Sequence, residues 1–293
     1  MKSGFAVWNR RDFLALSSAS FCLPKSYQSV FAAPGADVIT IGGAITEIAY
    51  ALEQGSRLVA RDTTSTYPAA AEKLPDVGYM RQLSAEGVLS FAPSLIISQE
   101  GAGPPEVIDI LQEARVPFVE VPNGYDRTGV VNKIHTVGAA FDVPGKALTL
   151  AEKIDAELQA VETKAARAET DRKRVMFILS TQGGRIMASG TGTGADGIVR
   201  LAGADNAVSS FEGYKPLSDE AVTASAPDVI LMMDRSGDHA VSDADLFEMP
   251  ALSATPAANS RSVVRMNGLY LLGFGPRTAQ AATDLNRALY PDT

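Results

Sequence analysis

The amino-acid sequence predicts an α/β protein with two Rossmann-like lobes, each built on a mainly parallel sheet, joined by one long α-helix. Three observations point to this fold class. A six-position pattern, Leu-Ser-x-Glu-x-Val-x4-Pro-x2-Ile, begins at Leu83 and again at Leu217, 134 positions later. Short apolar runs alternate with helix-like segments in both halves of the chain, as in parallel sheets. Between the halves, residues 144–172 have the composition of a long helix.

The two copies of the pattern predict the same local unit. In each copy a serine, followed two positions later by a glutamate (Glu86 or Glu220), begins a short helix, and a proline then precedes an apolar run typical of a buried strand. Two equal units indicate duplicated lobes with a cleft between them. The alternative is that unrelated helix-to-strand units resemble one another by chance.

The first lobe is expected over residues 36–143. Its first strand ends at Gly42-Gly43, and a helix begins with Thr46 and Glu47. The later elements alternate strand and helix, so the sheet is expected to be parallel. The predicted strands are residues 38–41, 58–60, 95–97 and 118–121, with a helix at about 105–114.

The connecting helix and the second lobe follow. Apolar residues recur at helical spacing in the segment 144–172, which predicts a single rigid helix that limits the lobes to small opening and closing motions. The second lobe is expected over residues 173–293. Its predicted elements include strands at 175–179 and 229–233 and a last helix at 278–289.

Residues 1–32 are expected to be an export signal. Arg10 and Arg11 precede a mildly apolar stretch, and small residues near position 32 predict cleavage that leaves Ala33 first. The run Asn-Arg-Arg-Asp-Phe-Leu resembles the twin-arginine signal, whose pathway exports folded proteins. The alternative is a basic N-terminal helix; its weak point is that the stretch is too short and too rich in serine to anchor the chain in a bilayer.

Composition excludes several classes of site and partner. Cys22, the single cysteine, lies in the expected signal after a phenylalanine, which argues against lipid attachment and leaves the mature chain without disulfides, thiolate-bound haem, iron–sulfur clusters or cysteine zinc sites. Removing residues 1–32 takes away four basic residues and one acidic residue, so the formal charge moves from −8 to −11. An acidic body argues against nucleic acid and anionic lipid as partners. No other stretch approaches a membrane-spanning length.

Two glycine-containing motifs are candidates for ligand sites. Gly192, Gly194 and Gly197 form G-x-G-x-x-G, but the helix after them is short and no acidic residue ends a second strand, so a cleft loop is favoured over a nucleotide site. Near the C-terminus, a Gly-Phe-Gly-Pro turn places Arg277 at the start of the last helix. A cation there opposes the helix dipole, which an anionic ligand would explain better than stability.

The histidines give no support for a metal or hydrolase centre. His135 has apolar neighbours and His239 lies in a polar run, far apart in the sequence and without ligand spacing. No G-x-S-x-G motif is present either. We therefore expect that the protein is not an enzyme.

Tyr67 is the strongest candidate for a ligand-binding residue. It follows the strand 58–60 and precedes a proline, which favours an extended residue in a loop at the carboxyl end of the sheet. Such a loop faces the expected cleft, although an ordinary loop tyrosine would also fit. Tyr79 and Arg81 lie in a glycine-led loop expected beside it.

Four spans of the sequence are specific in combination. They are Asp-Thr-Thr-Ser-Thr-Tyr-Pro at 62–68, Asp-Val-Gly-Tyr-Met-Arg at 76–81, Gly-Tyr-Lys-Pro-Leu-Ser at 213–218 and Leu-Gly-Phe-Gly-Pro-Arg-Thr at 272–278. With these spans the chain resembles the haemin-binding periplasmic proteins of bacterial ABC importers, and the resemblance covers essentially the whole mature chain. The fold that it implies, two α/β lobes joined by one long helix, agrees with the fold predicted from the repeat and the connecting helix.

The resemblance implies residue roles. A tyrosine at the position of Tyr67 binds the iron of ferric haem, and the arginine at the position of Arg277 interacts with that tyrosine or with the haem. Tyr79 and Arg81 are candidates for contacts with the porphyrin. Some relatives add a histidine from the second lobe, but the glycine-rich region 183–197 contains none here.

The resemblance also implies partners. In related importers one glutamate per lobe docks onto arginines of the permease, and Glu86 and Glu220 match those positions. We expect a monomeric periplasmic carrier of haem, Fe(III) protoporphyrin IX, with no nucleic acid partner and no membrane insertion. A siderophore or cobalamin carrier of the same fold is the main alternative, and a nucleotide-dependent enzyme using the loop at 192–197 is a second.

Overall fold

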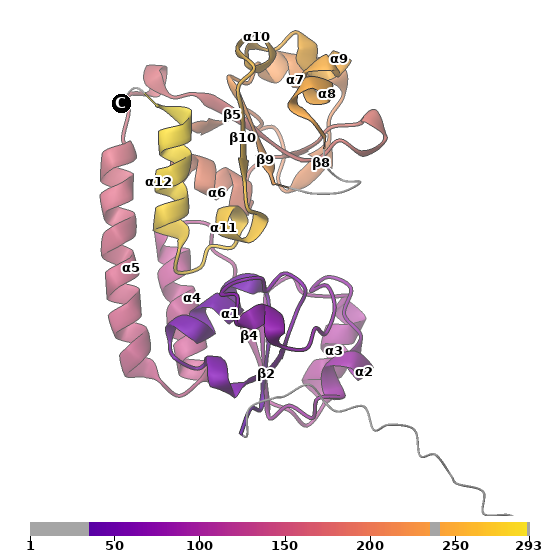
Figure 1. Ribbon diagram of the computed structural model, residues 1–293, viewed down its shortest axis with the longest axis vertical. Helices are drawn as coiled ribbons and strands as arrows, with labels where there is room; N and C mark the ends of the chain where they lie inside the picture. The colour runs from indigo at the N-terminus through magenta and orange to yellow at the C-terminus, as the bar shows by residue number, and fades with distance from the viewer. Residues whose placement is uncertain (1–34, 235–240, 292–293) are drawn as a thin grey trace, which may run out of the picture. The chain divides into compact units, whose positions relative to one another are not determined.

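The computed structural model describes residues 35–234 and 241–291. Within these residues, one sheet is formed by strands that precede the long helix α5 (Pro144–Ala165) in the sequence, and a second sheet by strands that follow it (Figure 1). The α/β fold class with two sheet-based lobes is confirmed. The expected export signal, residues 1–32, and His239 lie outside the described residues.

The first sheet is parallel throughout, in the order β2-β1-β3-β4. Residues of β1 and β3 pack into one hydrophobic cluster on one face and into a second cluster on the other. Both faces are therefore covered, which explains why these strands read as continuous apolar runs. The elements are β1 Val38–Ile41, α1 Gly43–Ala51, β2 Leu58–Arg61, α2 Ala85–Leu89, β3 Leu95–Gln99, α3 Pro105–Glu113, β4 Phe118–Val121 and α4 Arg127–Ala140.

The second sheet is mixed, in the order β10-β9-β5-β6-β8, with β7 paired to β5. Its strands β10, β9, β5 and β7 pair in parallel, whereas β6 pairs antiparallel with β5 and with β8. A short turn joins β5 to β6, and a tight hairpin can only be antiparallel. The strands are β5 Arg174–Ser180, β6 Met187–Ser189, β7 Asp205–Asn206, β8 Tyr214–Pro216, β9 Val229–Met233 and β10 Val263–Met266.

The helices of the second half cover this sheet and end the chain. They include the last helix, α12, which has the predicted bounds, 278–289. The helices are α6 Gly194–Leu201, α7 Asp219–Ser225, α8 Asp243–Glu248, α9 Pro250–Ser253, α10 Pro256–Ser260, α11 Gly268–Leu272 and α12 Thr278–Leu289.

Helix α5 packs beside α4 and α12 (Figure 1). It ends at Ala165, seven residues before the predicted end at 172, because Ala166 leaves the helical region with ψ of 124°. The apolar spacing also stops near Val161, so nothing beyond it calls for a helical face. The segment after α5 instead contains a 3-10 turn, Glu169–Asp171.

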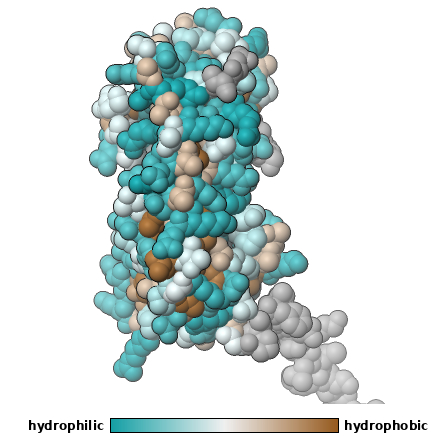
Figure 2. Space-filling model, turned by 90° about the vertical axis from the view of Figure 1, so that its left-hand side faces the viewer, coloured by the Kyte–Doolittle hydropathy of each residue, from teal (hydrophilic) through white to brown (hydrophobic). Residues whose placement is uncertain are grey.

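One hydrophobic cluster joins the two halves of the chain. It contains residues of β1 and β3 together with residues of β5, β9, α5 and α12. The face drawn in Figure 2 is largely hydrophilic, with hydrophobic residues in small groups. The shared cluster therefore packs both sheets against α5 and α12.

Candidate functional site

The loop that carries Tyr67 is held by a buried carboxylate. Asp62, directly after β2, is fully buried and accepts four hydrogen bonds, from Gly42 N at 2.9 Å, Thr64 N at 2.9 Å, Thr64 Oγ1 at 2.6 Å and Ser65 Oγ at 2.6 Å. These four donors satisfy both oxygens of the buried carboxylate and fix the start of the loop.

The same loop is joined to the first turn of α1. Thr46 Oγ1 lies 2.6 Å from Ser65 Oγ, and Gly43 N donates to Thr64 Oγ1 at 3.0 Å. At Gly43 a Cβ atom would lie 2.7 Å from Thr64 O, so the close approach requires glycine there. Helix α1 and the Tyr67 loop therefore form one hydrogen-bonded unit.

Tyr67 and Arg277 meet, although 210 residues separate them in the sequence. The Tyr67 side chain is 43% exposed, and the guanidinium carbon of Arg277 lies 3.5 Å from the centre of its ring. This is a cation–π contact at close range. It brings together the two residues that the sequence singled out from opposite halves of the chain.

Arg277 also binds a residue that the sequence analysis did not select. Glu47 on α1 accepts hydrogen bonds from Arg277 Nε at 3.0 Å, Arg277 Nη2 at 2.8 Å and Arg277 N at 3.2 Å. Its side chain is 6% exposed, against 24% for Arg277. The only signal in the sequence was an acidic residue in an otherwise apolar helix segment.

This pair corrects the argument made from the helix dipole. Arg277 is the residue that caps the N-terminal end of α12, as predicted, but the anion beside it is the carboxylate of Glu47. A carboxylate at the N-terminal end of a helix is stabilising and offsets the unfavourable arginine. The position of Arg277 therefore has an explanation within the protein and does not by itself require an anionic ligand.

Three further tyrosines near the site are poor sources of a phenolate. Burial raises the pKa of Tyr125, Tyr214 and Tyr270. For Tyr270 the carboxylate of Asp284, which accepts a hydrogen bond from the phenol at 2.8 Å, raises it further. These phenols stay protonated at neutral pH.

The loop with Tyr79 and Arg81 lies beside the Tyr67 loop. Thr63 N donates to Gly78 O at 3.0 Å, which ties the two loops together. Tyr79 is 42% exposed and Arg81 is also exposed. The charge of Arg81 acts on the phenol of Tyr125, lowering its pKa against the larger effect of burial.

The glycine motif at 192–197 has a packing role. A Cβ at Gly197 would lie 2.2 Å from Tyr125 O, and one at Gly194 would lie 3.1 Å from Leu272 O. The buried carboxylate of Asp196 accepts a hydrogen bond from Gly192 N at 3.2 Å. An anion already occupies this helix start, which disfavours a phosphate group there.

The remaining candidates add no site. His135 is exposed on α4. Within residues 35–234 and 241–291, no three or more His, Cys, Asp or Glu side chains are grouped so that they could hold a metal ion. In that same part of the chain, no helix combines the length and apolar character needed to cross a membrane.

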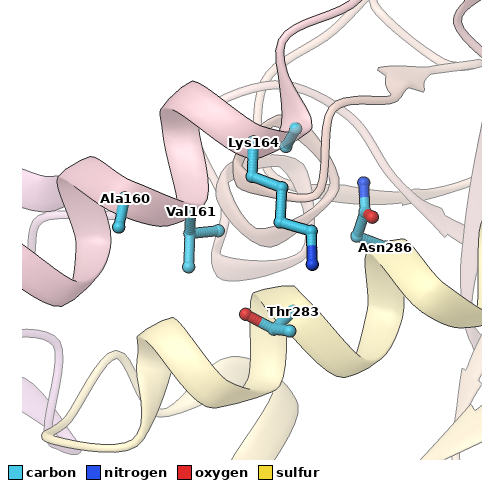
Figure 3. Close-up of a pocket in the computed structure, with 6 residues that line it drawn as sticks. Ala160, Val161, Lys164, Thr283 and Asn286 are labelled. Atoms are coloured by element: carbon cyan, nitrogen blue, oxygen red, sulfur yellow. The ribbon is translucent and has the colours of Figure 1, made fainter. Parts of the chain in front are cut away.

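A pocket lies between α5 and α12, away from these residues (Figure 3). Its volume of about 230 Å³ is below the roughly 300–1,000 Å³ of ligand pockets. Two of its polar groups are bound to the backbone, since Asn286 Nδ2 donates to Ala202 O at 2.9 Å and Thr283 Oγ1 donates to Ala279 O at 2.9 Å. It is a packing groove between helices.

The repeated pattern folds alike in both copies. Ser84 caps α2 by accepting from Gly87 N at 3.3 Å, and Ser218 caps α7 by accepting from Ala221 N at 3.3 Å. Each helix is followed by a strand, β3 or β9. Glu86 and Glu220 lie exposed in the first turns of these helices.

Two solved structures resemble this chain over almost their full length. The periplasmic haem-binding protein BhuT, solved in complex with two haems, is 41% identical with a TM-score of 0.82, and the match covers 87% of this chain and 98% of BhuT. The periplasmic haem-binding protein RhuT from Roseiflexus sp. RS-1, in its apo form, is 36% identical with a TM-score of 0.83, covering 88% of this chain and 99% of RhuT.

More distant relatives are similar in sequence. The uncharacterised ABC transporter substrate-binding lipoprotein YvrC of Bacillus subtilis (strain 168) is 26% identical over 258 residues, which are 87% of this chain and 80% of YvrC. The vitamin B12-binding protein of Pectobacterium atrosepticum is 26% identical over 275 residues, 93% of this chain and 91% of the relative. The family model for periplasmic binding proteins matches residues 38–268. Since that model spans both sheets and the helix between them, this chain belongs to the periplasmic binding protein family.

Proposed function

We propose that this protein binds ferric haem in the periplasm through the phenolate of Tyr67 and delivers it to the permease of an ABC importer. The observation that carries the proposal is the exposed ring of Tyr67 with the guanidinium of Arg277 against it. Support for haem as the ligand comes from the similarity to BhuT and RhuT, at 41% and 36% identity. The family binds substrates for transport, which agrees with the expectation that the protein is not an enzyme.

The chemistry of Tyr67 suits ferric iron. A phenolate is a hard, anionic oxygen ligand, and tyrosine is among the residues that hold haem iron in proteins. A free phenol loses its proton only near pH 10, so a neighbouring cation and the iron must favour the phenolate at neutral pH. Arg277 is that cation in our proposal, and Tyr67 is exposed, whereas the protonated Tyr125, Tyr214 and Tyr270 are half-buried.

The second loop completes the proposed site. Tyr79 and Arg81 are exposed on a loop that is hydrogen-bonded to the Tyr67 loop. We assign Tyr79 to contact with the porphyrin face and Arg81 to pairing with a propionate, because aromatic rings and guanidinium groups match those two parts of haem.

Haemin titration of the purified protein tests the proposal. A ferric complex with the charge-transfer bands of tyrosinate ligation is expected, and Tyr67→Phe is expected to abolish those bands and weaken binding about tenfold or more, that is by about 1.4 kcal/mol or more. Tyr50→Phe is the control, since Tyr50 is a half-buried tyrosine that packs against the hydrophobic cluster shared by the two halves. Tyrosinate bands that survive in Tyr67→Phe would reject the assignment.

A cobalamin or siderophore carrier is the second candidate, because the vitamin B12-binding protein of Pectobacterium atrosepticum matches 93% of this chain. Such a carrier has no need of an iron-binding phenolate. Titration with cyanocobalamin and with a ferric siderophore under the same conditions separates the two. Tighter binding of either compound than of haem would favour the second candidate.

A further inference from the structure

Glu47 is a buried carboxylate whose three hydrogen bonds all come from one residue. Its partners are the Nε, Nη2 and backbone N of Arg277, and both oxygens of the carboxylate take part. Burying a carboxylate is costly unless the carboxylate is paired with good geometry. A bidentate pair with arginine is among the strongest such arrangements. The pair joins α1, in the first half of the chain, to the start of α12 in the second.

We propose that Glu47 is a positioning residue of the Tyr67 site: it holds the guanidinium of Arg277 against the Tyr67 ring and so keeps the phenol in the position from which it would bind iron. This inference rests on the proposed function, since it concerns the residue pair that would bind haem. Glu47 is hydrogen-bonded to Arg277, and Arg277 in turn contacts Tyr67, so Glu47 acts through Arg277.

The geometry supports this role in two steps. One edge of the planar guanidinium, with Nε and Nη2, is used by the carboxylate, which leaves its face for the Tyr67 ring at 3.5 Å. The bond from Arg277 N to Glu47 Oε1 also fixes the backbone from which the side chain extends. Side chain and backbone of Arg277 are thus held by the same acidic group.

The other neighbours of Arg277 do not replace Glu47. They are the ring of Tyr67 and the ring of Tyr270 at 5.1 Å, and Tyr270 donates its hydroxyl to the carboxylate of Asp284. A ring offers no pair of oxygens to the guanidinium edge, so loss of the Glu47 carboxylate leaves Arg277 free to turn away from Tyr67.

Two substitutions at this position therefore have graded expected effects. Glu47→Ala releases Arg277, so haem should dissociate roughly fivefold faster or more and the tyrosinate bands at neutral pH should weaken. Glu47→Gln keeps the shape and one acceptor, so both effects should be smaller than in Glu47→Ala. Glu53→Gln removes an exposed carboxylate just after α1, paired with Lys146, and should match the wild type.

The outcomes separate this inference from the proposed function. A wild-type protein without bands that depend on Tyr67 rejects the proposed function itself. Normal wild-type bands with an unchanged haem dissociation rate in Glu47→Ala overturn the role of Glu47. In an Arg277→Ala background, Glu47→Ala should no longer speed haem dissociation, because the coupling passes through Arg277; an effect that persists there overturns the inference as well. Should Glu47→Ala fail to fold, the same comparison with Glu47→Gln decides the matter.

Discussion

Arg277 contacts groups from three parts of the chain, and its neighbours explain why an arginine can start a helix. Glu47 binds it, Tyr67 lies on one side and Tyr270 lies near. The guanidinium is planar and carries several donors, so it can bind a carboxylate along one edge and stack on a ring with its face at the same time. A lysine, as a point charge on a flexible stem, could not do both.

Lys133 on α4 is a buried charge that lowers stability at neutral pH. Its side chain is 1% exposed, its Nζ donates to Gly273 O at 3.4 Å, and burial lowers its pKa from 10.5 to about 8. Between about pH 8 and pH 10.5 the unfolded chain binds the extra proton, so the free energy of unfolding rises with pH across that window. Below pH 8 the lysine is charged in both states and the penalty stays constant.

The substitution Lys133→Met tests this penalty. It is expected to stabilise the fold by roughly 2 to 3 kcal/mol at pH 7 and to remove the part of the pH dependence due to this residue. Urea denaturation at pH 7 and pH 9.5 measures both effects. Lys153→Met, at an exposed position of α5, should leave the dependence as in the wild type, and a rise that persists in Lys133→Met would contradict the assignment.

At the scale of elements, glycines decide how closely helices approach their neighbours. Gly197 lets α6 lie against the backbone of Tyr125, where a Cβ would meet the carbonyl oxygen at 2.2 Å. The ring of Tyr125 then packs edge-on against Phe274, with ring centres 5.3 Å apart. Phe274 belongs to the turn that leads to Arg277, so the packing of α6 helps to hold that turn in place.

A pair of glycine substitutions tests this packing. Gly197→Ala is expected to destabilise the fold by about 1 to 3 kcal/mol through overpacking. Gly145→Ala in α5, where an added Cβ meets nothing within 4 Å, should stabilise it by up to about 1 kcal/mol. Thermal unfolding of both variants gives the comparison. Equal effects at the two positions would show that helix propensity, and not packing, governs Gly197.

At the scale of the whole molecule, the repeated pattern places one exposed glutamate on each lobe. Glu86 and Glu220 occupy equivalent first-turn positions on α2 and α7. Hydrogen bonds from its own backbone N–H and from Ser218 lower the pKa of Glu220, so it is ionised at neutral pH. We propose that this pair docks onto arginines of the permease, because charges at the rim of an interface orient the partner.

Charge reversal tests the docking proposal. The double variant Glu86→Arg with Glu220→Arg is expected to keep the haem affinity of the wild type and to lower haem uptake by cells by about tenfold or more, since like charges across an interface cost several kcal/mol. The matched control reverses Glu113 and Glu248, which are also exposed at helix ends. Normal uptake by the first variant would refute the role.

The sequence by itself determined the fold class, the helix-to-strand units at Glu86 and Glu220, and the selection of Tyr67 and Arg277. These follow from periodicity, capping and motifs, which are local properties of the chain. Only the tertiary structure decided that Glu47 is the anion beside Arg277 and that Gly194 and Gly197 serve packing. The physical reason is distance along the chain: Glu47 precedes Arg277 by 230 positions, and a hydrogen bond across such a separation exists only after both halves have packed on their shared core.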